Sequence, residues 1–183
     1  MKPSNHRTMT LAEATATFAI DRLLGEDFDE LIGHRLEEDD AVLVFEGDTA
    51  CAGDLDLIRH DPIAFGEPFD QWPHELVVVA GNLTMARIDL WQVQGLVVLG
   101  DLICDEIHLR ETPLYIQGRL LARTAVRATA EKEWHDERAR TLGPLYVRVQ
   151  GVVSSPLVET WCMPLQHLKW TGESGRETPL ILR

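Results

Sequence analysis

The most regular feature of the chain is a short phrase in which apolar positions alternate with other residues on both sides of a glycine. It occurs as VVVAGNL at 77–83, LVVLGDL at 96–102 and LYIQGRL at 114–120, with successive glycines 19 and 18 residues apart. A step of two is the period of a β-strand, in which alternate side chains point to the same face. Recurrence at a nearly fixed interval indicates a repeat architecture.

Two weaker copies of the phrase flank these three. LVFEGDT at 43–49 has its glycine 34 residues before Gly81, and VRVQGVV at 147–153 has its glycine 33 residues after Gly118. Aligned on glycine, the copies share two wholly apolar columns, formed by Leu43, Val77, Leu96, Leu114 and Val147 and by Phe45, Val79, Val98, Ile116 and Val149. Shorter apolar runs follow, at Ile88 and Leu90 and at Ile107 and Leu109. Each repeat is therefore predicted to supply at least two inward-facing strands.

These columns predict a mainly β fold, a parallel β-helix (β-solenoid) of about five rungs over 41–126 and 144–158. We expect the glycine where a side chain would crowd the neighbouring rung. The register predicts that Val98→Asp unfolds the protein, whereas Val97→Asp, expected to point outward, is mild. An antiparallel sandwich is the alternative, but it does not explain the agreement of the columns, and Asn-Gly and Asp-Gly turns are absent from the chain.

The remaining segments are expected to complete a single domain, 1–183. Residues 10–33 are predicted to form an N-terminal helical cap over the open end of the β-helix. Residues 128–142, rich in Ala, Glu, Lys and Arg, are predicted to form one inserted helix. Residues 159–183 are expected to be a C-terminal cover or an added strand, and residues 1–9 to be loose.

The predicted cap has recognisable helix signals. Thr10-Leu-Ala-Glu13 has the form of a capping box, in which the Thr hydroxyl and the Glu carboxylate satisfy backbone donors of the first turn. An apolar stripe of Leu11, Ala14, Phe18 and Leu23, with Leu24 beside it, follows, and Gly25 is a plausible end.

Charge is distributed unevenly along the chain, whose formal net charge is −13. Residues 1–75 contain 18 Asp/Glu and 5 Lys/Arg, whereas 76–183 contain 12 of each, so the excess belongs to the N-terminal part. Such a charge argues against nucleic acid or an anionic membrane as partner. The chain shows neither a signal peptide nor an apolar run long enough to span a bilayer, so we expect a cytoplasmic protein.

Several groups could bind a metal, but none has a recognised signature. Glu131 and His135 are four residues apart on the predicted helix and share one of its faces, with Asp136 and Glu137 beside them. The pairs Asp54/Asp56 and Asp27/Asp29 have a calcium-like spacing outside any EF-hand or calcium-binding repeat. A surface role is the simpler interpretation for all of these and for His34, His60 and Asp61. We therefore predict no metal-binding and no cofactor-binding residues.

Catalytic signatures are also lacking. Cys162 and His167 could form a nucleophile and base only through the fold, and Cys51 and Cys104 are expected to be buried thiols. The carboxylates expected to project outward from the strands, as in carbohydrate-active β-helices, are Asp89, Asp101 and Glu106. Outward carboxylates also occur on any hydrated sheet, so we predict no catalytic residue and keep a small hydrolase or lyase as an alternative.

The run LVVLGDLICDEIHL, with VVVAGNLTMARIDL before it and LYIQGRLLARTAV after it, resembles the bactofilins, which are polymer-forming bacterial cytoskeletal proteins. The resemblance covers roughly residues 76–126. It implies a β-helix core in a nucleotide-free scaffold that assembles end to end through its terminal rungs. The N-terminal helical segment and the Trp-rich tail of this chain depart from that pattern.

Two functions follow from these features. The first is a non-enzymatic β-solenoid that serves as a scaffold or protein-interaction module, with self-association into a homo-oligomer as one form of it. The alternative is an acidic binding or inhibitor protein, comparable to a toxin-immunity factor, that recognises a basic partner through the N-terminal charge.

Overall fold

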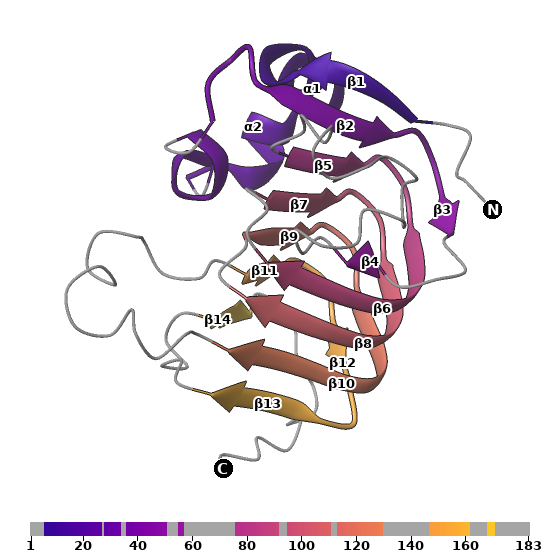
Figure 1. Ribbon diagram of the computed structural model, residues 1–183. Coiled ribbons are helices and arrows are strands. Elements are labelled where there is room, and N and C mark those ends of the chain that lie inside the picture. Colours follow the sequence, from indigo (N-terminus) through magenta and orange to yellow (C-terminus); the bar gives the residue numbers. More distant parts are fainter. Residues whose placement is uncertain are drawn as a thin grey trace.

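The strands of this protein form two stacked layers that are joined repeatedly by the chain (Figure 1). The computed structural model describes residues 6–26, 28–33, 36–50, 55–56, 76–91, 95–110, 113–129, 147–161 and 168–170. Within these ranges the fold is mainly β, with two sheets of parallel strands and few helices, as the apolar columns predicted. The antiparallel sandwich is excluded for the described strands, because a single pair among them is antiparallel.

Each sheet has seven strands among the described residues. The first sheet contains, in spatial order, β1 (His6–Thr10), β2 (Ala41–Phe45), β5 (Leu76–Val79), β7 (Gly95–Val98), β9 (Leu114–Ile116), β11 (Val147–Val149) and β14 (Leu168–Trp170). The second contains β3 (Thr49–Ala50) and β4 (Leu55–Asp56) beside β6 (Leu83–Trp91), then β8 (Leu102–Arg110) and β10 (Leu120–Thr129), and finally β12 (Val153–Ser154) and β13 (Val158–Trp161). Among the described strands, β1 at the edge of the first sheet is the only one that runs antiparallel to its neighbour, which is β2.

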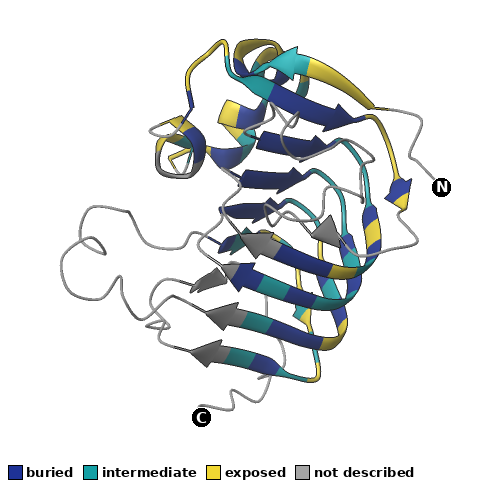
Figure 2. Cartoon of the chain, viewed as in Figure 1, coloured by how far each residue is buried: buried dark blue, intermediate teal, exposed yellow. Residues whose placement is uncertain are grey.

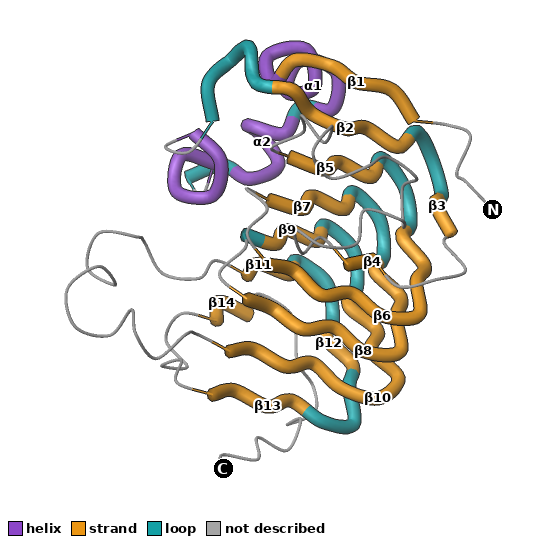
Figure 3. The backbone as a smooth tube through the Cα atoms, in the orientation of Figure 1, coloured by secondary structure: helices purple, strands orange, loops and turns teal. Residues whose placement is uncertain are grey.

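The chain alternates between the two sheets and advances by one position each time. Every described passage from the first sheet to the second is a three-residue connection, which we call the glycine corner (Figure 3). The glycine corners are 46–48, 80–82, 99–101, 117–119 and 150–152. The return from the second sheet to the first varies in length, which explains the unequal intervals between glycines in the sequence.

Strand register confirms the predicted apolar columns. Leu43, Val77, Leu96, Leu114 and Val147 lie in register across the first sheet, and so do Phe45, Val79, Val98, Ile116 and Val149. In the second sheet Leu83, Leu102 and Leu120 are aligned in the same way. These inward side chains form one buried apolar cluster. Figure 2 shows β5, β7 and β9 buried along their whole length. Burial of the cluster stabilises the fold by roughly 25 cal/mol for each Å² of apolar surface removed from water.

The recurring glycine is required by contact between successive corners. An added Cβ at Gly100 would lie 2.7 Å from the carbonyl carbon of Gly81, and one at Gly118 would lie 2.6 Å from the carbonyl oxygen of Gly100. Both distances are shorter than any normal contact of a Cβ atom, so only hydrogen fits. The amide of Gly118 also donates to the Gly100 carbonyl over 3.0 Å. The predicted crowding by the neighbouring repeat is confirmed.

The outer face of the first sheet is buried as well, which corrects the expected position of Val97. Val97 is only 2% exposed and belongs to a second apolar cluster, together with Val44, Val78 and Tyr115. The helices α1 (Leu11–Phe18) and α2 (Ile20–Leu24) cover this face. A strand buried on both faces is apolar at every position, as in the run LVVV of β5.

Two predictions about the N-terminal segment are wrong in detail. Residues His6–Thr10 are not loose but form β1, paired with β2. The helices of the predicted cap at 10–33 pack on the face of the first sheet rather than over the end of the stack, where β1 lies instead. This position stabilises the helices because it buries their apolar stripe against the apolar residues of one continuous sheet surface.

The later segments are described only in part. The helix predicted at 128–142 cannot begin at Ala128, because Ala128 and Thr129 end strand β10, and residues 130–142 lie outside the described residues. Within 159–183, Leu168–Trp170 is an added strand, β14, and Glu159–Trp161 belongs to β13. None of the described helices combines the length and hydrophobicity needed to cross a bilayer. The cytoplasmic location stays a prediction.

Candidate functional site

The layer on the outer face of the first sheet is the part of the described structure with the most distinctive surface. We call α1, α2, the π-helical turn Asp29–Gly33 and the loop 36–40 the helical layer. The predicted capping box is present in it: the amide of Glu13 donates to the Thr10 hydroxyl over 3.1 Å, and the Thr10 amide donates to the Glu13 carboxylate over 3.0 Å. Helix α1 therefore starts where the sequence indicated.

The predicted apolar stripe is divided between two helices. Ala19 adopts a left-handed conformation (φ 52°, ψ 41°), which ends α1 and starts α2. This break turns the chain so that Ile20 and Leu24 are both fully buried against the sheet. Gly25 then ends α2, as predicted, and its amide donates to the Asp21 carbonyl over 2.8 Å.

One side chain of the first sheet, Tyr115, and one of a glycine corner, Gln150, hold the end of α2 in place. The Tyr115 hydroxyl donates to the Leu23 carbonyl over 3.1 Å, and Gln150 Nε2 donates to the same oxygen over 3.2 Å. Carbonyls of the last helical turn have no partner within the helix, so these bonds satisfy an otherwise open acceptor. Burial raises the pKa of Tyr115 from its ordinary 10 to about 12, so the hydroxyl stays a donor even at a pH at which an exposed tyrosine ionises.

A cavity of about 650 Å³ opens between the elements of the helical layer. Its apolar lining consists mainly of Leu11, Ala12 and Ala16 from α1 and of Phe28 and Leu36 from the chain after α2. Among the described residues, three carboxylates, Asp21, Asp29 and Glu38, and one cation, Arg22, also line it. The Thr15 hydroxyl oxygen in its wall is buried and has no hydrogen-bond partner among the described residues. The site thus combines apolar surface with an excess of negative charge.

The surface around this cavity is acidic too. Among the described residues from Leu11 to Asp40, one cation is exposed, Arg22, and the exposed carboxylates are those of Glu13, Asp21, Glu26, Asp29, Glu37, Glu38 and Asp39. Much of the negative charge that the sequence placed in residues 1–75 is therefore displayed on one layer. A concentration of one sign attracts oppositely charged partners and accelerates their association.

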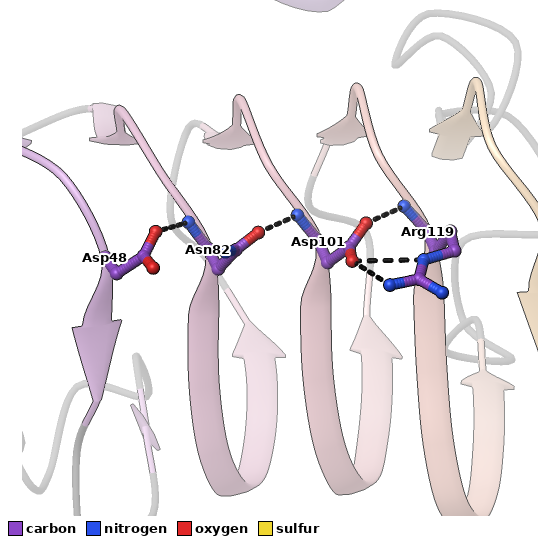
Figure 4. A network of polar contacts seen from close by, with 4 residues as sticks. All are labelled: Asp48, Asn82, Asp101 and Arg119. Atoms are coloured by element: carbon purple, nitrogen blue, oxygen red, sulfur yellow. Dashed lines mark hydrogen bonds and ion pairs between the residues drawn. The ribbon is translucent and has the colours of Figure 1, made fainter.

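The glycine corners contain a ladder of polar contacts (Figure 4). Asp48 accepts from the amide of Asn82, Asn82 Oδ1 accepts from the amide of Asp101, and Asp101 accepts from the amide of Arg119, each over 2.8 Å. The guanidinium of Arg119 also pairs with Asp101 and holds the pKa of that carboxyl below its usual value. Asp101, one of the three carboxylates predicted to point outward, therefore links successive corners.

The other two carboxylates predicted to project outward lie on the second sheet beside cations, but one of them, Asp89, is buried rather than facing water. Glu106 forms an ion pair with Arg127 Nε over 2.8 Å. Asp89 is only 4% exposed, and its Oδ2 is 3.5 Å from Arg87 Nη2 and 3.7 Å from His108 Nδ1. The three carboxylates thus differ in surroundings, and each contacts a basic side chain. This arrangement ties neighbouring strands together and gives no support to the hydrolase alternative.

The remaining candidates give no described site. Burial raises the pKa of the Cys104 thiol to about 12, so it is an inert core group, as predicted. No group of three or more His, Cys, Asp or Glu side chains suited to a metal occurs within the described residues. Outside the described residues lie Glu131, His135, Asp136, Glu137, Cys162, His167, Asp54, Asp27, His34, His60, Asp61 and Cys51. Asp56 is placed in β4 opposite Asp89, and Asp29 lines the cavity.

Sequence reasoning located the acidic segment but missed the cavity. The charge excess of residues 1–75 was the only signal of this site in the sequence, since the cavity depends on the spacing between separate elements. Comparison of the chain with protein-family models, with curated proteins and with solved structures finds no match. The likeness to bactofilins therefore stays a prediction from the residues.

Proposed function

We propose that the chain forms a closed parallel β-helix of about five rungs and serves as a non-enzymatic protein-interaction module for a basic partner. The parallel register of the strands and the regular glycine corners support the β-helix. Ion pairs and polar ladders between strands, such as Arg127 with Glu106 and Asp101 with Arg119, support a rigid framework.

The observation that carries the function is the position of the acidic helical layer. Its apolar side is fixed to the sheet by Ile20, Leu24 and the bonds of Tyr115 and Gln150 to Leu23, while its carboxylates and its cavity face outward. A rigidly held surface of one charge favours a protein partner of the opposite charge, because little order has to be gained on binding. This proposal combines the two functions expected from the sequence, a non-enzymatic protein-interaction module and an acidic protein that binds a basic partner.

Peptide display tests this function while the partner itself is unidentified. Random peptides are selected on the immobilised protein and counter-selected on a variant in which Asp21, Asp29, Glu37 and Glu38 are changed to Asn or Gln. We expect Lys/Arg-rich peptides that bind the parent, lose most of their affinity for the variant and weaken as salt rises. Enrichment of peptides without basic residues, or of peptides that bind both proteins equally, would contradict the function.

A second candidate, end-to-end self-association, is favoured by the second sheet. Its described terminal strands, β3 and β4 at one end and β12 and β13 at the other, all run parallel to the interior strands. Strands of two copies could thus continue the same parallel pairing. Light scattering coupled to gel filtration over a wide concentration range tests this candidate: a growing mass supports it, and a constant monomer mass excludes it.

A further inference from the structure

The cavity of the helical layer has the size and composition of a binding site. Its volume of about 650 Å³ lies within the range of roughly 300–1,000 Å³ typical of ligand sites. Leu11 and Leu36 form buried parts of its lining, while Ala12 and Ala16 are exposed at its wall with the smallest side chains that a helix surface can carry. Alanines at these places leave room for an apolar side chain from another molecule.

The charges around the cavity indicate which residues would flank the bound apolar side chain in the other molecule. Asp21, Asp29 and Glu38 are exposed and belong to the lining, and Arg22 is the one cation among the described lining residues. Carboxylates from α2, from the π-helical turn and from the loop therefore surround an apolar centre on several sides. Lysine or arginine side chains next to a bound apolar residue would meet carboxylates on these sides.

A second copy of this chain is a poor occupant. Its described arginines outside the helical layer largely form ion pairs within the chain. Arg7 pairs with Glu46, Arg119 with Asp101 and Arg123 with Asp105. Two copies would also bring two acidic layers together. The charge complementarity is thus best satisfied by a different protein.

We propose that the cavity binds a basic amphipathic segment of a partner protein, with an apolar side chain in the cavity and Lys or Arg residues on Asp21, Asp29 and Glu38. This inference rests on the proposed function and specifies its site. It goes further than a diffuse charge attraction, because it requires the cavity itself to be open.

Two fluorescent synthetic peptides serve as probes in anisotropy titrations. Both are amphipathic helices with the same Leu/Phe stripe, flanked by Lys and Arg in one and by Glu in the other. The wall variant Ala16→Trp fills the cavity, and Thr17→Trp, at an exposed position of α1 outside the lining, is its matched control. Asp29→Asn with Glu38→Gln removes two lining charges, and Glu26→Gln with Asp39→Asn removes two exposed charges outside the lining.

We expect binding of the basic peptide alone, a loss of at least about tenfold with Ala16→Trp and a change within about twofold with Thr17→Trp. The lining pair should weaken binding roughly threefold to tenfold, and clearly more than the control pair. Circular dichroism of each variant establishes that the layer stays folded.

Three results would overturn the site. Equal effects of the two charge pairs, with no effect of Ala16→Trp, would mean that the peptide binds the acidic layer outside the cavity, and the proposed function would survive. Equal binding of the basic and acidic peptides would contradict both the site and the function. A dimer of the parent that Ala16→Trp disrupts would assign the cavity to a second copy.

Discussion

Gly100 shows most directly how closely successive corners approach. A methyl group there would lie 2.6 Å from Asn82 Oδ1 and 2.7 Å from the carbonyl of Gly81, so two stacked corners would have to separate. We expect Gly100→Ala to lower the free energy of unfolding by about 3 kcal/mol or more, measured by urea denaturation.

Gly47 is the matched control for this prediction. It belongs to the first corner of the stack, and a Cβ there would have nothing within 4 Å, although its φ of +79° is unfavourable for alanine. Gly47→Ala should therefore cost only about 1 kcal/mol, from backbone strain alone. Equal losses for the two variants would mean that conformation rather than contact requires the glycines.

Val97 carries a prediction that reverses the one from the sequence. Because it is 2% exposed beneath the helical layer, Val97→Asp buries an uncompensated charge and should cost about 4 kcal/mol or more, comparable to Val98→Asp. The exposed Thr84, in β6, replaces it as the mild position, and Thr84→Asp should cost less than about 1 kcal/mol. Thermal and urea unfolding of the three variants distinguish these cases.

Such residues mark the limit of what alternation alone can predict. The inward columns were readable because each copy of the phrase repeats the same constraint at the same distance from glycine. The outward positions Val78, Val97 and Tyr115 were not, since their burial depends on helices that come much earlier in the chain. Their apolar character was visible, but alternation does not distinguish an outward position from one on a second buried face.

At the scale of elements, each hydrogen bond of the ladder between glycine corners is accepted by a side chain of the same shape, that of Asp or Asn. Asp101 accepts from the Arg119 amide as Asn82 accepts from the Asp101 amide, so an amide can replace the carboxylate. We expect Asp101→Ala to cost about 2 kcal/mol and Asp101→Asn about half as much, in urea denaturation at neutral pH.

The same pair of variants makes a prediction for acid. The pKa of Asp101 lies below its ordinary value of 3.8 because of Arg119, so its contribution is complete above that pH and is lost as the pH falls through the lowered pKa. The parent should therefore lose its advantage over Asp101→Asn below about pH 4. A constant difference down to about pH 2 would show that the carboxylate charge adds nothing to the ladder.

Attachment of the helical layer can be followed through Tyr115. Tyr115→Phe removes its bond to the Leu23 carbonyl but leaves that of Gln150, so the loss at neutral pH should be about 1 kcal/mol. The folded pKa of about 12 exceeds the ordinary 10, so tyrosine-linked stability is complete below pH 10 and is lost between 10 and 12. The free-energy difference between parent and variant should shrink over that interval, and a difference independent of pH would contradict the burial of the ionising hydroxyl.

The elements of the layer were only partly predictable. The capping box and Gly25 gave the two ends of the helical stretch, because both signals act within a few residues. The left-handed Ala19 had no local signal: its conformation is stabilised by the burial of Ile20 and Leu24 on a distant sheet. β1 was missed for the same reason, since its polar sequence HRTMT becomes a strand through its pairing with β2.

For the whole molecule, β1 distinguishes the two ends of the stack. Its antiparallel direction interrupts the parallel pairing of the first sheet at that end, and Arg7 and Glu46 form an ion pair there. By covering the edge of β2, β1 prevents that strand from pairing with another molecule. Deletion of residues 1–8 should expose the parallel edge of β2 and make the mass in light scattering rise with concentration, whereas the control Arg7→Gln should leave it unchanged. A constant mass after deletion would show that β1 does not limit association.

The constant glycine corner and the variable return connection have a consequence for how such a chain can change. The corner fixes the advance from strand to strand, because its glycine and the residue after it contact the neighbouring corner. On the opposite side the length of the connection varies, since returns as short as 92–94 and as long as 57–75 lead to the same register. New segments could therefore be acquired, lost or grafted at every return without moving a strand. Insertions at the returns can thus evolve independently of the buried core.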